Sequence, residues 1–342
     1  MMRLPSFAYR APKTIDDAAA WLAEAPGETM LLGGGTDVVP NMKRRQQVPR
    51  TVIGLRQVED LSTIRNGDGL TIGAGATLTD VVRDERIRTA VPGLWQAAAQ
   101  IATPQLRNMG TVGGNLCLDT RCTYYDQSYE WRKAIDFCMK KDGETCWVAT
   151  SSPKCLAVSS TDLAPMLQAL GAEVRLRSAD GERSVALPDL YRNDGIEYLT
   201  RRPDEILTDV RVPDQAGWQS AYWKLRRRGS FDFPVASAAV AARIDGGGRV
   251  EEVRIVLGAV ASRPLASPKA EAMLEGQTLT DDLIAAAADA AYAIAKPMDN
   301  TDFELVWRKK MVRMLVSRAL ADVRGDDMRE ARQRLARQAL IF

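Results

Sequence analysis

The chain has 342 residues, of which 46% are hydrophobic, so it can bury a large core, and its length predicts two or three domains. Its 46 Lys and Arg residues nearly balance 44 Asp and Glu residues, which argues against nucleic acid as the main partner. Histidine is absent, which excludes Ser-His-Asp triads, histidine bases and histidine-ligated metals, so any chemistry is expected to belong to a cofactor.

The apolar segments are too short for a membrane protein. The longest, residues 284–295, is Ala-rich and falls well below the roughly 20 residues of a spanning helix. The first residues, Met1 to Ser6, lack the apolar region of a secretory signal. We therefore expect a cytoplasmic protein with no membrane partner.

The N-terminal residues predict a helix, a strand, a glycine loop and a second strand. Thr14 precedes an Ala-rich amphipathic stretch that ends at Pro26-Gly27, as expected of a helix capped by a hydroxyl side chain. The apolar segments 29–32 and 51–55 are typical of strands, and the first runs directly into Gly33-Gly34-Gly35-Thr36-Asp37.

Strand and helix patterns continue through the rest of the chain. In the middle we expect a hairpin at 63–72, helices at 91–102 and 162–167, a hairpin at 173–187 and a strand at 206–212. Beyond a predicted boundary at Pro213-Asp214 we expect strands near 221–227, 236–244 and 250–257, and helices near 269–274, 281–295 and 302–322. These last elements predict an α+β domain.

Two kinds of pattern indicate phosphate binding. Glycine-rich turns at Gly33–Asp37 and Gly110–Asn115 let backbone amides approach an anion, because no Cβ obstructs them. Either turn alone is also explained by a tight structural turn, but a flavin dinucleotide is long enough to need both. The basic clusters Lys43–Arg45 and Arg226–Arg228 fit either a solvated surface or a phosphate site.

All five cysteines lie within a poorly periodic part of the chain, and we interpret residues 118–157 as an insertion. The last four follow the spacing C-x15-C-x7-C-x8-C, which matches neither a zinc knuckle nor a ferredoxin motif. We expect a four-thiolate site whose metal–sulfur bonds replace a hydrophobic core, with a [4Fe–4S] cluster favoured over zinc or unligated thiols. Cys117 is expected to be a small buried apolar residue.

Four motifs stand out together: Leu32-Gly33-Gly34-Gly35-Thr36-Asp37, Thr71-Ile72-Gly73-Ala74-Gly75-Ala76, Gly110-Thr111-Val112-Gly113-Gly114-Asn115 and Asp162-Leu163-Ala164-Pro165. They resemble the FAD-binding (medium) subunit of the xanthine oxidase, or molybdenum hydroxylase, family over roughly residues 5–320. Within that family, the spacing of the last four cysteines is similar to that of the β subunit of 4-hydroxybenzoyl-CoA reductase. That similarity implies a [4Fe–4S] cluster in the insertion.

The resemblance implies an α+β fold with two N-terminal FAD-binding subdomains of the vanillyl-alcohol-oxidase type, at about 1–56 and 57–213. The iron–sulfur insertion at 118–157 would belong to the second subdomain. A C-terminal α+β domain would follow at 214–325, and residues 326–342 would form an accessory helical tail.

The resemblance also implies which residues hold the cofactors. The cofactor-binding residues would be Leu31, Leu32, Gly33, Gly34, Gly35, Thr36, Asp37, Val38, Ile101, Thr111, Val112, Gly113, Gly114, Asn115, Thr123, Asp162 and Lys224, and the metal ligands Cys122, Cys138, Cys146 and Cys155. Residues 31–38 would wrap the pyrophosphate, and 111–115 would lie along the flavin and ribityl chain. Ile101 is also explained as a core helix residue, and Lys224 as a surface strand residue.

The implied function is electron transfer within a larger enzyme. A large subunit would hold molybdopterin and substrate, a small subunit two [2Fe–2S] clusters, and this chain FAD and [4Fe–4S], as a dimer of heterotrimers. With ferredoxin or another low-potential donor, the enzyme would remove the phenolic hydroxyl of 4-hydroxybenzoyl-CoA or a related aryl-CoA. Alternatives are an oxidative hydroxylase of an aromatic or heteroaromatic substrate, a zinc-stapled nucleotide-binding module, and a stand-alone oxidase, which the lack of histidine disfavours.

Overall fold

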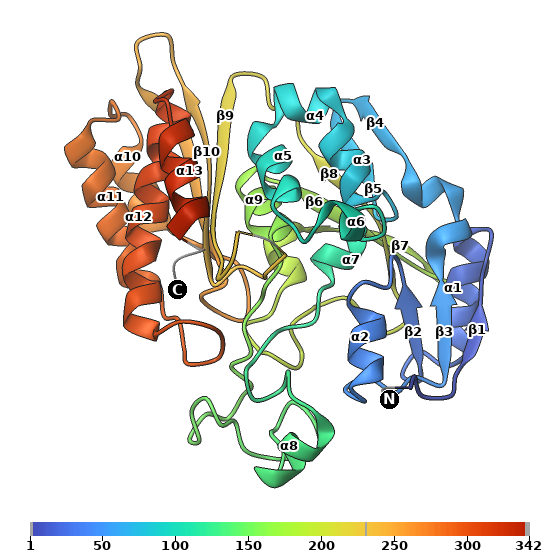
Figure 1. Ribbon diagram of the computed structural model, residues 1–342. Helices are drawn as coiled ribbons and strands as arrows, with labels where there is room; N and C mark the ends of the chain where they lie inside the picture. The colour runs from blue at the N-terminus through green and yellow to red at the C-terminus, as the bar shows by residue number, and fades with distance from the viewer. Residues whose placement is uncertain (1–2, 230, 339–342) are drawn as a thin grey trace.

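The computed structural model describes residues 3–229 and 231–338. Within them, three β-sheets follow one another across the molecule, each accompanied by helices (Figure 1). The predicted fold of an α+β N-terminal part and an α+β C-terminal domain is confirmed. No helix in these described residues is both long and apolar enough to cross a bilayer.

The first sheet is small and parallel, with strand order β1-β3-β2. It contains β1 (Ala8–Arg10), β2 (Thr29–Leu32) and β3 (Thr51–Gly54), connected through α1 (Ile15–Glu24) and α2 (Val38–Lys43). Thr14 caps α1 as predicted, because its hydroxyl accepts a hydrogen bond from the Asp17 amide. Since β2 and β3 run in parallel, the first glycine loop after β2 and the turn η1 (Leu55–Gln57) after β3 lie at the same edge of this sheet.

The second sheet is antiparallel, with strand order β4-β5-β8-β6-β7. Its strands are β4 (Ile64–Gly67), β5 (Gly69–Gly73), β6 (Glu173–Ser178), β7 (Gly181–Ala186) and β8 (Ile206–Val212). The associated helices are η2 (Glu59–Ser62), α3 (Leu78–Arg83), α4 (Glu85–Ala90), α5 (Pro92–Ala99), α6 (Pro104–Arg107), α7 (Val112–Leu116), α9 (Leu163–Ala169) and η3 (Leu187–Leu190). The largest apolar core lies between this sheet and the helices α3, α5, α7 and α9.

The third sheet forms the C-terminal domain, with strand order β12-β11-β10-β9. Its strands are β9 (Trp218–Leu225), β10 (Ala236–Ile244), β11 (Val250–Gly258) and β12 (Leu265–Ala266), and its helices are α10 (Pro268–Leu274), α11 (Asp281–Ile294) and α12 (Leu305–Arg324). These helices and the sheet enclose a second apolar core. The other face of β9 and β10 packs against α5 and α9, so the two cores share this sheet.

The predicted insertion is a loop-rich excursion that projects from the body of the molecule (Figure 1). Its two ends are held together by a β-bridge, in which the amides of Arg121 and Val158 donate to each other's carbonyl oxygens at 2.8 and 2.7 Å. Among the described residues, its regular structure is limited to the short helix α8 (Tyr129–Ala134). A small apolar cluster that includes three of the cysteines is its only core.

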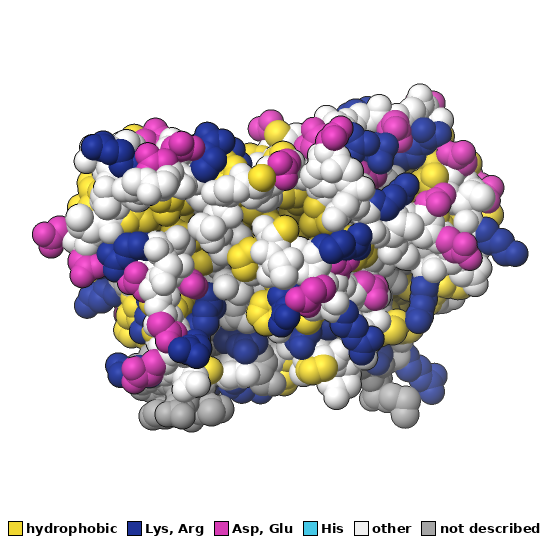
Figure 2. Space-filling view, turned by 90° about the horizontal axis from the view of Figure 1, so that it is seen from above, with side chains coloured by type: hydrophobic (Ala, Val, Ile, Leu, Met, Phe, Trp, Pro, Cys, Tyr) yellow, Lys and Arg dark blue, Asp and Glu magenta, His cyan; other side chains and the backbone are white. Residues whose placement is uncertain are grey.

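Acidic and basic side chains are interspersed on the face shown in Figure 2, with apolar side chains visible between them. Two residues of the second basic cluster form ion pairs. Arg227 pairs with Asp302 and Arg228 with Asp232, at 3.0 and 2.5 Å. Arg44 instead lines a cavity described below.

The tail predicted at 326–342 contains a helix, α13 (Arg329–Gln338), and its residues 339–342 lie outside the described residues. Arg332 attaches this helix to three elements. Its guanidinium pairs with Asp322 of α12 and donates to Gln96 Oε1 of α5 at 2.9 Å and to the Tyr222 carbonyl of β9 at 3.2 Å. The same group lies 4.2 Å from the centre of the Trp223 ring. Arg332 therefore joins the C-terminal domain to α5.

Replacing Arg332 should destabilise the chain, because its partners lose charged hydrogen bonds worth about 1–3 kcal/mol in total. We expect Arg332→Ala to lower the midpoint of thermal unfolding by several degrees. The matched control is Arg334→Ala, since Arg334 is exposed and, among the described residues, its ion pair is with Glu330 of its own helix. Equal midpoints for the two variants in calorimetry would show that the tail contributes nothing to domain packing.

Candidate functional site

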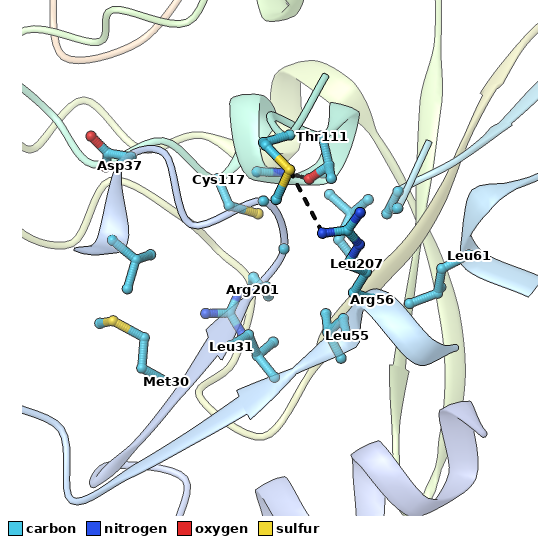
Figure 3. A pocket seen from close by; sticks show the side chains of 18 of the residues that line it. Met30, Leu31, Asp37, Leu55, Arg56, Leu61, Thr111, Cys117, Arg201 and Leu207 are labelled. Atoms are coloured by element: carbon cyan, nitrogen blue, oxygen red, sulfur yellow. Dashed lines mark hydrogen bonds between the residues drawn. The ribbon is translucent and has the colours of Figure 1, made fainter. Parts of the chain in front are cut away.

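Two cavities, of about 500 and about 430 Å³, meet at the glycine turns between the first two sheets. Residues that line both are Leu31, Gly33, Gly34, Asp37, Val38, Thr111, Gly114 and Cys117. The first cavity extends between β2, the η1 turn and the start of β8 (Figure 3). The second extends toward the C-terminal domain and is lined there by Ile101, Asp162 and Lys224. Together they form an elongated site that suits an extended ligand.

The two glycine turns pack directly on each other. A Cβ at Gly34 would lie 1.7 Å from the Met109 carbonyl oxygen, and one at Gly33 would lie 2.7 Å from Thr111 Oγ1. Gly35 has a φ of +72°, which residues with a side chain adopt only with strain. Glycine is therefore required at these positions for the first turn to reach the second.

The second glycine cluster was expected to be a loop, but residues 112–116 form the short helix α7. Thr111 caps it by accepting a hydrogen bond from the Gly114 amide at 3.1 Å. Asn115 Oδ1 accepts from the Thr161 hydroxyl at 2.7 Å and from the Leu163 amide at 3.1 Å. Asn115 thus fixes α7 to the start of α9.

Asp37, at the end of the first glycine turn, is neutralised by Arg121 from the neck of the insertion. Arg121 is 6% exposed and also pairs with Asp126 at 3.4 Å. Asn41 completes the network, because its amide donates to Asp37 Oδ2 at 3.0 Å and its oxygen accepts from Arg121 at 3.2 Å. The position of the first turn is therefore coupled to the neck of the insertion.

A buried ion pair lies in the wall of the second cavity. Lys224 Nζ of β9 lies 2.9 Å from Asp162 Oδ2, and the Tyr222 hydroxyl donates to Asp162 Oδ1 at 2.7 Å. Both charged residues are at most 3% exposed. Burial is the main influence, raising the pKa of Asp162 and lowering the pKa of Lys224, while their mutual attraction opposes both shifts. Lys224 is a buried residue rather than a surface strand residue.

A second bridge connects the insertion to the first cavity. The Lys140 ammonium donates to Asp119 Oδ1 at 2.8 Å, Thr120 Oγ1 at 2.7 Å and the Gly195 carbonyl at 2.6 Å. Asp119 lines the first cavity, and the Gly195 amide donates to the Cys155 carbonyl at 2.9 Å. Lys140 therefore lies between a predicted metal ligand and the cavity wall.

Most of the predicted cofactor-binding residues line one of the two cavities. These are Leu31, Gly33, Gly34, Gly35, Thr36, Asp37, Val38, Ile101, Thr111, Gly113, Gly114, Asn115, Asp162 and Lys224. Leu32 lies beneath Gly35, and Val112 is buried in the core of the second sheet. Thr123 lines a third cavity of about 280 Å³, which adjoins the second at Arg121, Phe231 and Phe233, and its amide donates to the Asn300 carbonyl. The structure therefore does not bring Leu32, Val112 or Thr123 to the two cavities.

The four predicted metal ligands, Cys122, Cys138, Cys146 and Cys155, are buried thiols without disulfides. Cys122, Cys138 and Cys155 share one apolar cluster, and Cys146 is close enough to Cys155 to influence its ionisation. Burial raises the pKa of Cys122 to about 12 and that of Cys155 to about 11. In the described part of the chain, no group of three or more Cys, Asp or Glu side chains meets the geometry of a metal site. The [4Fe–4S] cluster thus stays a prediction.

Several lining residues carry no sequence motif that predicts them. Arg56, Met109, Tyr198 and Arg201 line the first cavity, and Phe231 and Phe233 line the second. Cys117 was expected to be a buried apolar residue, and it lines both cavities. Burial raises the pKa of its thiol. Arg56 could have been predicted as a site residue, because it follows the end of strand β3. No local sequence pattern identifies Arg201.

Comparison with known proteins identifies the family. The model of the FAD binding domain in molybdopterin dehydrogenase matches residues 5–215, and that of the CO dehydrogenase flavoprotein C-terminal domain matches residues 220–323. The carbon monoxide dehydrogenase medium chain of Afipia carboxidovorans is 30% identical over 317 residues, covering 92% of this chain and 96% of that protein. The aldehyde oxidoreductase FAD-binding subunit of Escherichia coli is 30% identical over 335 residues, which cover 93% of this chain and 99% of that protein.

A solved structure agrees with these matches. A chain of the Cu,Mo-CO dehydrogenase in its cyanide-inactivated form superposes with a TM-score of 0.79 at 29% identity, covering 95% of this chain and 99% of that chain. Both the two glycine turns and the C-terminal domain fall within the matched segments. The chain therefore belongs to the molybdenum hydroxylase family, as one of its FAD-binding medium subunits.

Proposed function

We propose that this chain is the flavin subunit of a three-subunit molybdenum enzyme and that its insertion carries an additional [4Fe–4S] cluster. The observation that supports the cluster is the gathering of four buried cysteines in a segment with almost no other core. The partners would be a large molybdopterin subunit and a small subunit with two [2Fe–2S] clusters, assembled as a dimer of heterotrimers.

The elongated site fits FAD. Two cavities joined at a pair of glycine turns suit a dinucleotide, with amides of the turns free to approach its phosphates. The second cavity would take the flavin ring, since Ile101 offers an apolar contact and Lys224 a buried cation there. Bound flavin supplies the exchange between two-electron and one-electron carriers. The residues of this chain orient it and exclude water.

The four cysteine sulfurs of the insertion are suitable ligands for an iron–sulfur cluster. Sulfur ligands favour iron–sulfur clusters and zinc over hard cations. Because burial raises the thiol pKa values, Cys122 and Cys155 hold their protons at neutral pH in the metal-free chain, so loading a metal would release them. Cys122, Cys138, Cys146 and Cys155 would be the ligands.

The reaction we propose is reductive. With electrons from ferredoxin or another low-potential donor, the assembled enzyme would remove the phenolic hydroxyl of 4-hydroxybenzoyl-CoA or a related aryl-CoA, at a site on the large subunit. The spacing of the four cysteines supports this substrate class. A second candidate, oxidative hydroxylation of an aromatic or heteroaromatic substrate, is favoured by the names of two further relatives, a nicotinate dehydrogenase FAD-subunit and a nicotine 6-hydroxylase medium subunit.

Cofactor content tests the cluster. In the chain purified anaerobically, we expect about four iron atoms, about four acid-labile sulfides and about one FAD. Cys138→Ser should lower the iron content because it removes a ligand, whereas Cys117→Ser, outside the thiol cluster, should keep it. Zinc in place of iron, or a full iron content in Cys138→Ser, would contradict the proposed cluster. The chain would then be a flavin subunit whose insertion has a structural role alone.

The direction of the reaction is tested with the assembled enzyme. We expect reduced ferredoxin to be oxidised when 4-hydroxybenzoyl-CoA is added, with benzoyl-CoA detected by chromatography. The same substrate without the 4-hydroxyl group is the matched control and should leave ferredoxin reduced. If a heteroaromatic substrate instead bleaches the flavin absorbance of the oxidised enzyme and the aryl-CoA does nothing, the oxidative candidate replaces the reductive one.

A further inference from the structure

Two arginines line the first cavity without an acidic partner. Arg56 belongs to the η1 turn and Arg201 to the segment before β8, and Figure 3 shows both among the lining residues. Arg201 Nη1 donates to the backbone carbonyls of Arg202 and Glu205, and Arg56 Nη1 contacts the Met109 sulfur at 3.6 Å. In the described part of the chain, neither guanidinium forms an ion pair with a carboxylate.

The carboxylates of the same cavity are already engaged elsewhere. Asp37 pairs with Arg121, and Asp119 pairs with Lys140. Asp80 accepts hydrogen bonds from the amide and hydroxyl of Thr77 in the capping box of α3, at 2.9 and 2.6 Å. None of them neutralises Arg56 or Arg201, so the wall of the cavity presents excess positive charge to a ligand.

Arg201 is held in place by its own chain. It is half-buried, and one guanidinium nitrogen is fixed by two carbonyls, while no described group bonds to its Nε or Nη2. A guanidinium with free N–H groups matches the oxygens of a phosphate, and fixing it in advance lowers the entropic cost of binding. This arrangement points to a phosphorylated ligand.

The position of the arginines selects the part of the ligand. Arg56 and Arg201 line the first cavity and are absent from the second, where Ile101 and Lys224 lie. If the flavin ring occupies the second cavity, the ADP half of the dinucleotide extends past the glycine turns into the first. Riboflavin has no phosphate, and FMN keeps only the flavin-side phosphate, so both lack the adenosine-side phosphate that FAD would offer to the two guanidinium groups.

We propose that Arg201, assisted by Arg56, binds the adenosine-side phosphate of the diphosphate and so makes the site select FAD over FMN. This inference rests on the proposed function as an FAD carrier. It adds two specificity-determining residues that lie far from the glycine motifs in the sequence. The amides of the glycine turns approach the diphosphate from one side, and the two arginines supply charge from the other.

The test measures binding of FAD, FMN, ADP and adenosine to the full-length chain after flavin removal, by titration calorimetry. In Arg201→Gln, we expect the affinity for FAD and ADP to fall about 10- to 100-fold, because a charged hydrogen-bond donor is lost, and the affinity for adenosine to stay unchanged. Preference for FAD over FMN should shrink by the same factor. Arg201→Lys should recover part of the ADP affinity, since it restores charge without the planar fork.

The matched control is Arg202→Gln, which removes the neighbouring arginine. Arg202 is exposed, pairs with Asp204 and Glu205 and does not line the cavity, and Glu205 keeps its pair with Arg183, so this variant should bind all four ligands as the wild type does. Arg56→Gln provides a second variant on another wall, with an expected smaller loss of ADP affinity because Arg56 is exposed. It keeps the inference testable if Arg201→Gln does not fold.

Unchanged ADP affinity in Arg201→Gln and Arg56→Gln would overturn the inference while leaving FAD binding intact. Parallel losses of ADP and adenosine would also overturn it, because they would indicate a role in cavity shape rather than in phosphate recognition. A wild-type chain that binds neither FAD nor ADP would overturn the proposed function together with the inference.

Discussion

The close approach of the two glycine turns is the constraint on which the site depends. Gly34 lies so near the Met109 carbonyl that any Cβ there would overlap it, so the first sheet can reach α7 only through glycine. This contact brings the edge of the first sheet against the second sheet and creates both cavities at its two sides. A substitution at Gly34 would therefore move two subdomains apart rather than disturb one loop.

Three carboxylates, of which Asp119 and Asp162 are buried and Asp37 is half-buried, then couple the site to the rest of the chain. Asp37 is neutralised by Arg121 from the insertion neck, Asp119 by Lys140 from the insertion, and Asp162 by Lys224 from the C-terminal domain. Each carboxylate lines a cavity, and Lys140 and Lys224 come from separately packed segments. Removing one partner of such a pair leaves a buried charge uncompensated, which costs about 3–5 kcal/mol. The cavity walls are thus completed only when the insertion and the C-terminal domain are in place.

The sequence predicts the long elements and the glycine motifs well. Strands 206–212 and 236–244 have the predicted bounds, because their largely apolar patterns end at Pro213 and at a glycine turn. Helices α3 and α4 were missed, since six residues are too few to establish a helical period. Arg201 and Lys140 could not be predicted as site residues, because each reaches the cavity wall only through tertiary packing of distant segments. Local sequence patterns therefore predict glycine turns, which would contact a ligand through backbone amides. They do not predict charged side chains that reach the cavity from distant segments.

The insertion brings these arguments together. Its apolar cluster is small, so the iron–sulfur cluster that we propose would supply most of the segment's stability through ligation of the four thiols. The same segment supplies Arg121 and Lys140, which neutralise Asp37 and Asp119 at the cavities. Under the proposed function, loss of the cluster would loosen this segment, withdraw both cations and leave two carboxylates facing the phosphates of a bound dinucleotide. Loss of the metal should therefore weaken flavin binding through electrostatics, without any shared ligand between the two cofactors.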